Sequence, residues 1–195
     1  MPPFKQLTII AGVALLPFSV YADKKKEDPI EQGLRDAFAA YQDEDLASVK
    51  TSLAEVLKAI EEKEVARVGE TLPDKVDQWE ASELEKEDLK ALGGGISVKR
   101  TYTMEPKSIT AKVVMHSPLV DKWIELLGNR QALKFTNKKV YTVDGEAALV
   151  ENDHKILIGV DQKILVELVG DNDTDSRDII AFVRKLGLKK IKELK

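Results

Sequence analysis

The stretch GGGISVKRTYTMEPKSITAKVVM, residues 93–115, decides how the second half of the chain folds. After the three glycines, apolar and polar residues alternate with the period of two that is typical of β-strands. One side of the first strand is apolar except for an arginine, and it consists of Ile96, Val98, Arg100, Tyr102 and Met104. A turn at residues 105–107 leads to a second alternating segment at 109–115. The stretch therefore predicts an antiparallel pair of strands.

Downstream of this pair, the pattern predicts a helix, a meander of strands and a closing helix. Ser117-Pro118 begins the helix, and Gly128-Asn129 ends it. Four further strands are expected at residues 133–143, 146–151, 155–160 and 163–169. Asp144-Gly145 between the first two is a strong hairpin signal. The last helix follows residues 171–175 and is expected to break at Gly187.

Upstream of the glycines, two amphipathic segments predict a helical hairpin. The first begins at Asp28-Pro29, an N-cap followed by proline, and carries its apolar residues on one stripe. The second begins after an acidic turn at residues 43–45 and ends near Val68-Gly69. Two helices joined by a short turn pack antiparallel. We expect the hairpin to bury its stripes on the protein's own sheet; the alternative is a groove offered to another chain.

A connector at residues 71–95 joins the hairpin to the strands. A short strand near Trp79 and a short acidic helix at residues 82–92 are both compatible with it. The triple glycine predicts a hinge or a close backbone approach, because a phosphate loop would need a second, spaced glycine and Lys-Ser/Thr before a helix. The chain is therefore expected to be an α+β protein, with the hairpin (23–70), this connector and an antiparallel domain of about six strands covered by helices (96–195).

The first 22 residues predict an export signal. Lys5 precedes an apolar run at residues 7–20, and Val20-Tyr21-Ala22 is a small-x-small cleavage pattern. Fourteen apolar residues are too few to cross a bilayer, which takes about 20 residues in a helix. We therefore expect a periplasmic or secreted bacterial protein with no transmembrane segment after cleavage. An uncleaved anchor is the alternative.

Composition excludes several chemistries. The 195 residues contain no cysteine and two histidines, which excludes disulfides, thiolate chemistry and a three-histidine zinc site. Residues 23–92 hold 11 basic and 20 acidic residues, whereas residues 93–195 hold 18 and 14. This division can orient the halves toward different partners, or it can reflect two solvated faces. With a pI of about 5.4, nucleic-acid binding is not expected.

The order of elements from Leu72-Pro73 onward resembles the α+β fold shared by the PsbP extrinsic protein of photosystem II and the DcrB-like exported bacterial proteins. A strand–turn–strand segment of that group has a similar sequence. The matching residues here run from Thr136-Asn137-Lys138-Lys139-Val140 through Asp144-Gly145-Glu146-Ala147-Ala148. The resemblance covers about 120 residues. Many DcrB-like members are lipoproteins, and this chain departs from them because it has no cysteine. The resemblance implies an accessory or assembly role without catalytic residues.

Candidate sites are few. Asp171, Asp173 and Asp175 occupy the first acidic positions of a calcium loop, but Ser176 and Phe182 replace its glycine and its glutamate. The alternative is a polar loop in which Asp175 caps the last helix. The candidates for a binding surface are Trp79, Arg100 and Tyr102; a buried Arg100 would need a carboxylate or an anionic ligand. Neither His116 nor His154 forms a triad pattern, and no cofactor is expected.

These observations predict an exported, non-catalytic binding or accessory protein of the cell envelope that acts through protein–protein contact. The first alternative is a periplasmic protein that binds a small ligand or calcium. A second is an envelope hydrolase that uses carboxylates from residues 80–88. A third is a purely structural protein whose charged halves bridge an envelope surface. The sequence specifies neither the partner nor the oligomeric state.

Overall fold

The computed structural model describes residues 28–135 and 138–194. The export signal expected at residues 1–22 therefore lies outside the described residues. The helices, in chain order, are α1 (Pro29–Gln42), α2 (Leu46–Gly69), the 3₁₀ turn η1 (Lys90–Leu92), α3 (Pro118–Gly128), α4 (Arg130–Phe135), α5 (Ser176–Leu186) and α6 (Lys189–Lys192). The strands are β1 (Lys75–Val76), β2 (Trp79–Ala81), β3 (Glu85–Glu87), β4 (Ile96–Met104), β5 (Lys107–Met115), β6 (Val140–Val143), β7 (Glu146–Asn152), β8 (Lys155–Val160) and β9 (Ile164–Gly170).

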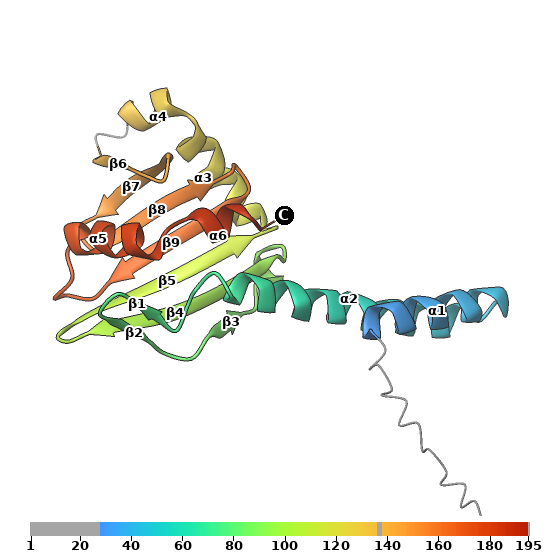
Figure 1. The fold of residues 1–195 in the computed structure, drawn as a ribbon. Coiled ribbons are helices and arrows are strands. Elements are labelled where there is room, and N and C mark those ends of the chain that lie inside the picture. Colours follow the sequence, from blue (N-terminus) through green and yellow to red (C-terminus); the bar gives the residue numbers. More distant parts are fainter. Residues whose placement is uncertain (1–27, 136–137, 195) are drawn as a thin grey trace, which may run out of the picture.

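The predicted fold class is confirmed: a helical hairpin precedes an antiparallel sheet with helices on both faces (Figure 1). The sheet has nine strands, more than the six expected, in the order β1-β2-β4-β5-β9-β8-β7-β6, with β3 also paired to β4. The three additional strands are short and come from the connector. The predicted pair at residues 96–115 forms the long β4–β5 hairpin, in register from Ile96↔Met115 to Met104↔Lys107.

The sheet separates two apolar cores. The larger lies under α5 and α6 and includes Tyr102, Ile158 and Phe182, each with no more than 1% of its surface exposed. The smaller lies under α3 and includes Leu157 and Leu165. Alternation along each strand sends successive side chains to opposite faces, so one run of residues supplies both cores.

Two local predictions were wrong. Residues 133–135 belong to α4 rather than to a strand, because the Asn129 side chain accepts hydrogen bonds from the backbone of Gln131 and Ala132 and caps a helix there. The acidic helix at residues 82–92 is replaced by β3 and η1. Lys86 pairs with Val98 of β4 in that strand, and the gain of sheet hydrogen bonds outweighs a weak local helix preference.

The connector is confirmed to contain a strand at Trp79 and a close approach at the glycines. Gly93, Gly94 and Gly95 all have positive φ angles. A Cβ on Gly95 would lie 2.8 Å from the backbone oxygen of His116, so only glycine fits at this position.

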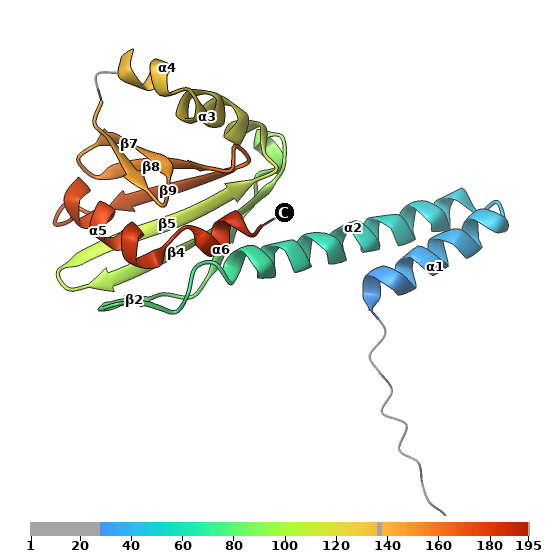
Figure 2. The same ribbon diagram turned by 45° about the horizontal axis from the view of Figure 1, so that its top comes forward.

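The hairpin does not dock on the sheet as expected. Figure 2 shows α1 and most of α2 extending away from the rest of the protein, with only the end of α2 beside the sheet. As a result, the apolar stripes that were expected to be buried remain partly exposed.

Candidate protein-contact surface

The two hairpin helices pack through small residues. A Cβ on Gly33 would lie 2.6 Å from Cγ2 of Val56, so α1 and α2 approach closely at this point. Gly33, Ala37 and Val56 are the buried residues of this contact. Asp28 and Asp45 accept hydrogen bonds from the first backbone N–H groups of α1 and α2 and so cap both helices. Small side chains therefore form the contact between α1 and α2, and the large apolar side chains of the two helices lie outside it.

Six large apolar side chains lie beside this contact rather than within it. They are Leu34, Phe38 and Tyr41 of α1 and Leu46, Leu53 and Leu57 of α2. Leu34 comes one residue after the buried Gly33, Phe38 one residue after the buried Ala37, and Leu57 one residue after the buried Val56. Each step of one residue turns the side chain by 100° around the helix axis. Because the two helices are antiparallel, this turn points the three side chains to the same side of the hairpin. The six residues therefore form one face, which we call the hairpin face.

The hairpin face is unusually apolar for a surface. Its six side chains are between 41% and 66% exposed. Together they expose several hundred Å², which is comparable to the largest apolar patch on a typical monomer, and patches of that size mark interaction sites. Aromatic residues such as Phe38 and Tyr41 are also enriched among the residues that contribute most to binding.

The hairpin that carries this face is acidic. Residues 28–70 contain eleven acidic and five basic residues. The excess is greatest toward the tip, where residues 36–55 contain five acidic residues and Lys50 as the single basic one. The hairpin thus combines exposed apolar side chains with a negative electrostatic field.

Of the predicted binding residues, Arg100 and Tyr102 hydrogen-bond the segment just after α2, and Trp79 lies in the core. Arg100 Nη1 donates to the Leu72 carbonyl and pairs with an Asp74 carboxylate oxygen, each at 2.7 Å. Asp74 is thus the carboxylate partner that a buried Arg100 was expected to need.

The other two candidates are core residues, and Tyr102 also bonds to the segment after α2. The Tyr102 hydroxyl donates to the Pro73 carbonyl at 3.0 Å, and its burial raises the pKa of the phenol to about 12. Trp79 is 7% exposed and packs edge-on against Phe182, so a partner-facing Trp79 is excluded.

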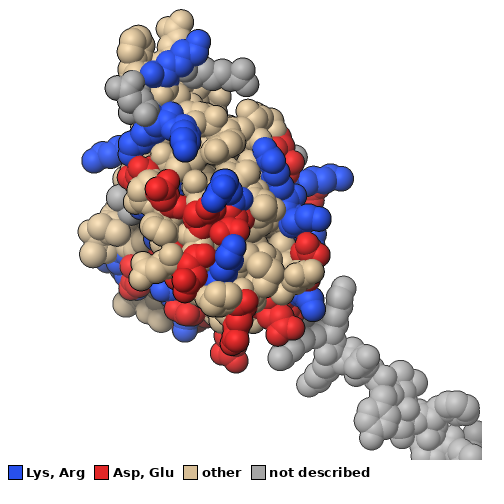
Figure 3. Space-filling model, turned by 90° about the vertical axis from the view of Figure 1, so that its left-hand side faces the viewer, with Lys and Arg blue, Asp and Glu red and all other residues tan. Residues whose placement is uncertain are grey.

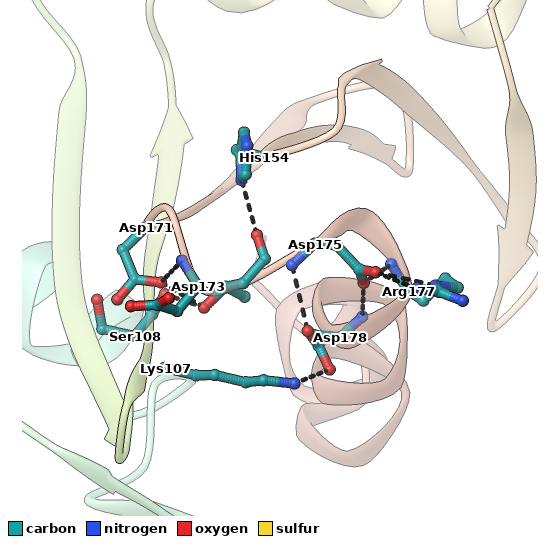
Figure 4. Close-up of polar contacts among 9 residues, drawn as sticks. Lys107, Ser108, His154, Asp171, Asp173, Asp175, Arg177 and Asp178 are labelled. Carbon is teal, nitrogen blue, oxygen red and sulfur yellow. Dashed lines mark hydrogen bonds and ion pairs between the residues drawn. The ribbon is translucent and has the colours of Figure 1, made fainter.

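The aspartate loop does not bring its carboxylates together. Asp171 accepts a hydrogen bond from the Thr174 hydroxyl at 2.6 Å, while Asp175 caps α5 and pairs with Arg177. Figure 4 shows the Asp175 carboxylate turned toward Arg177, away from Asp171 and Asp173. The Arg177 guanidinium and the cap bonds lower the pKa of Asp175 to about 2. The calcium candidate is therefore not supported by the geometry, and within residues 28–135 and 138–194 no group of three acidic or histidine residues is placed to hold a metal ion.

The two histidines lie apart. His116 is exposed and has its Nδ1 3.9 Å from Glu64 of α2, and His154 Nδ1 lies 2.8 Å from the Thr174 carbonyl. Because a carbonyl only accepts, Nδ1 of His154 is the donor in that bond. His154 therefore ties the β7–β8 turn to the loop before α5 (Figure 4).

Two acidic residues of the connector, Glu85 and Glu87 of β3, begin a series of ion pairs that crosses the sheet from β3 to β7. The pairs run from Glu85 and Glu87 through Lys99, Lys112, Glu167 and Lys155 to Glu151, with N–O distances between 3.0 and 3.5 Å. Burial alone would raise the pKa of Glu87, but the Ser97 hydroxyl and the two lysines outweigh it, so this pKa lies below its ordinary value. Glu85 and Glu87, two of the acidic residues within 80–88, are thus held in ion pairs, and the hydrolase alternative stays a prediction.

This series of ion pairs predicts a pH-dependent loss of stability. Burial raises the pKa of Glu167, but hydrogen bonds from Lys155 and Lys112 outweigh it and lower that pKa from 4.5. A lowered pKa in the folded state stabilises the fold above the unfolded value, and the stabilisation disappears as the pH falls through the folded value. Glu167→Gln should therefore reduce the free energy of unfolding by about 1–2 kcal/mol at pH 7 and by less at pH 3.

Urea unfolding of both proteins at the two pH values checks this expectation. Glu62→Gln is the control, because Glu62 is 66% exposed and 4.0 Å from Lys58. An equal loss at pH 7 and pH 3 for Glu167→Gln would show that the ionised form does not matter.

The charged surface elsewhere is mixed. Figure 3 shows basic and acidic side chains interspersed over the end of the molecule where α5 begins, with no continuous basic area on that face. None of the helices within the described part of the chain is long and apolar enough to cross a membrane.

Comparison of the chain with protein-family models, with curated proteins and with solved structures found no match. The likeness to PsbP and DcrB-like proteins thus stays a prediction. The fold and the hairpin face define an α+β protein with a projecting, acidic and apolar helical hairpin. Sequence reasoning found the apolar stripes but not their exposure; the small residues Gly33 and Ala37 were the available signal that the helices pack without the larger side chains.

Proposed function

We propose that the protein is an exported, non-catalytic accessory protein of the cell envelope that binds a partner protein through the hairpin face. The observation that carries the proposal is the exposure of six large apolar side chains on a hairpin that projects from the sheet. The export part of the proposal is supported by the apolar run at residues 7–20 and by Val20-Tyr21-Ala22.

Charge complementarity defines the partner. An apolar surface within an excess of acidic residues fits an apolar protein segment flanked by lysine and arginine. Because residues 36–55 carry the same sign of charge in every copy, a second hairpin is a less favourable occupant. A helix of the partner that crosses the hairpin would cover apolar side chains of both α1 and α2.

Photocrosslinking in the native cells tests the proposal. A benzoylphenylalanine in place of Phe38 or of Leu57 should crosslink to one and the same protein. Controls carry it in place of Ala39 or Thr51, which lie on the opposite side of the hairpin and should give no such adduct. Peptide mapping should place the adduct in an apolar segment with neighbouring lysine or arginine.

Three outcomes contradict the proposal. These are the absence of an adduct from both hairpin-face positions, equal adducts from both sides of the hairpin, and an adduct on an acidic segment. A second copy of the chain as the crosslinked protein would reject the basic partner and show self-association instead.

A further inference from the structure

The far edge of the sheet has backbone groups without a neighbouring strand. β6 is the last strand in the order and pairs only with β7. The backbone N–H of Val150 donates to the carbonyl of Lys139 at 2.9 Å. In an antiparallel pair the hydrogen-bonded positions alternate, so this bond makes Tyr141 and Val143 the next bonded residues. The N–H and C=O groups of Val140 and Thr142 consequently point away from β7, and no strand lies on that side among residues 28–135 and 138–194.

An apolar cavity lies directly beside these groups. It has a volume of about 350 Å³, and Leu133, Val140, Thr142 and Ala147 are among the residues that line it. Ligand pockets in proteins range from about 300 to 1,000 Å³, so this one suits one or two side chains rather than a large ligand. Val140 is 43% exposed at its rim.

The surroundings of this edge are basic. Residues 129–143 contain four basic residues and no acidic one. Lys134 of α4 also lines the cavity, and Lys139 immediately precedes β6. The uppermost charged side chains in Figure 3, at the α4 end of the molecule, are likewise basic. The sign of charge is opposite to that of the hairpin, which lies at the other end of the sheet (Figure 1).

From these three features we infer that β6 binds an extended, acidic peptide segment as an additional strand. The outward N–H and C=O groups of Val140 and Thr142 would hydrogen-bond the backbone of the segment. An apolar side chain of the segment would enter the cavity between α4 and β6. The acidic residues that alternate with it would lie on the other face of the sheet, the side of Lys139. Lys134 at the cavity would add to the positive field that attracts the segment. Strand addition of this kind gains affinity from the backbone and specificity from the pocket that receives alternate side chains. The inference does not depend on the hairpin, because it concerns a different surface and a partner of opposite charge.

The same lysines could serve only to prevent strand pairing, since charged residues commonly protect exposed sheet edges. Fluorescence anisotropy with purified protein separates the two roles. The probe is a fluorescein-labelled peptide of sequence EVEFEV, compared with KVKFKV and with EVEFEV methylated at alternate backbone nitrogens. The first peptide should bind, and each of the other two should bind at least tenfold more weakly. Amide hydrogen exchange of Val140 and Thr142 should slow on binding.

Protein variants provide the second arm of the experiment. Lys134→Glu/Lys139→Glu should weaken EVEFEV binding at least tenfold. Lys50→Glu/Lys58→Glu changes the net charge equally at exposed positions of α2, in the hairpin at the other end of the sheet, and should leave binding within twofold. The inference is rejected if EVEFEV does not bind, if all three peptides bind alike, or if exchange slows at β1 rather than at β6. Equal effects of the two double variants would show attraction by net charge alone and would also reject it.

Discussion

Phe38→Ser/Leu57→Ser should weaken binding of the crosslinked partner segment at least ~100-fold, because each residue is a large apolar contact whose loss costs about 2 kcal/mol or more at an interface hot spot. The two residues lie on different helices of the hairpin face and are 63% and 66% exposed. Neither is part of the small-residue contact at Gly33 and Val56. The hairpin should therefore remain folded.

Two measurements check this result. Calorimetry with the purified segment gives the affinity, and the fluorescence of an apolar dye, which binds exposed hydrophobic surface, should fall in the variant even without a partner. Ala39→Ser/Thr51→Ser places serines on the opposite side and should change neither quantity. Circular dichroism should show the same helix content in all three proteins. A variant that retains both dye and partner binding would exclude the hairpin face as the contact surface.

Phe182→Ala should lower the free energy of unfolding by about 3–5 kcal/mol, the usual cost of removing a fully buried aromatic side chain. Phe182 is 1% exposed, and its ring centroid lies 4.9 Å from that of Tyr102 and 5.5 Å from that of Trp79. The truncation leaves a cavity between α5, β2 and β4. Because domains are stable by about 5–15 kcal/mol, such a loss is a large share of the total.

Urea unfolding followed by tryptophan fluorescence measures this loss, since Trp79 lies against the altered position. Phe38→Ala is a control with the same chemical change at an exposed position, and its free energy of unfolding should stay within about 0.5 kcal/mol of the parent value. If both variants lost the same stability, the large core would not be centred on Phe182.

The regular strands were predictable because their signal is local. Alternation from Ile96 to Met115 depends only on neighbouring residues, and the expected antiparallel pair of strands is observed as β4 and β5. Asp144, with a positive φ angle, and Gly145 form the expected turn between β6 and β7. In these segments, residue type alone determined which side faces a core.

The errors arose where distant residues decide the structure. β3 exists because Lys86 lies next to Val98 of β4, a pairing that nothing within residues 82–92 encodes. Leu133 and Phe135 belong to a run too short to distinguish a strand from a helix by its period. The apolar stripes of the hairpin were correctly found, but a stripe does not tell which of its members touches the neighbouring helix. Only the structure showed that Gly33 and Val56 do so and that Phe38 does not.

The continuous α2 helix places the tip of the hairpin far from the sheet. Its 24 residues span about 36 Å at 1.5 Å per residue, and only its last turns lie beside the sheet. A tilt of about 10° at its base would move the tip by roughly 6 Å. Arg100 and Tyr102 hydrogen-bond the segment just after α2, so the loss of these contacts should widen the range of hairpin orientations. A few hydrogen bonds at the base of the hairpin would then affect the position of its tip, which lies more than 30 Å away.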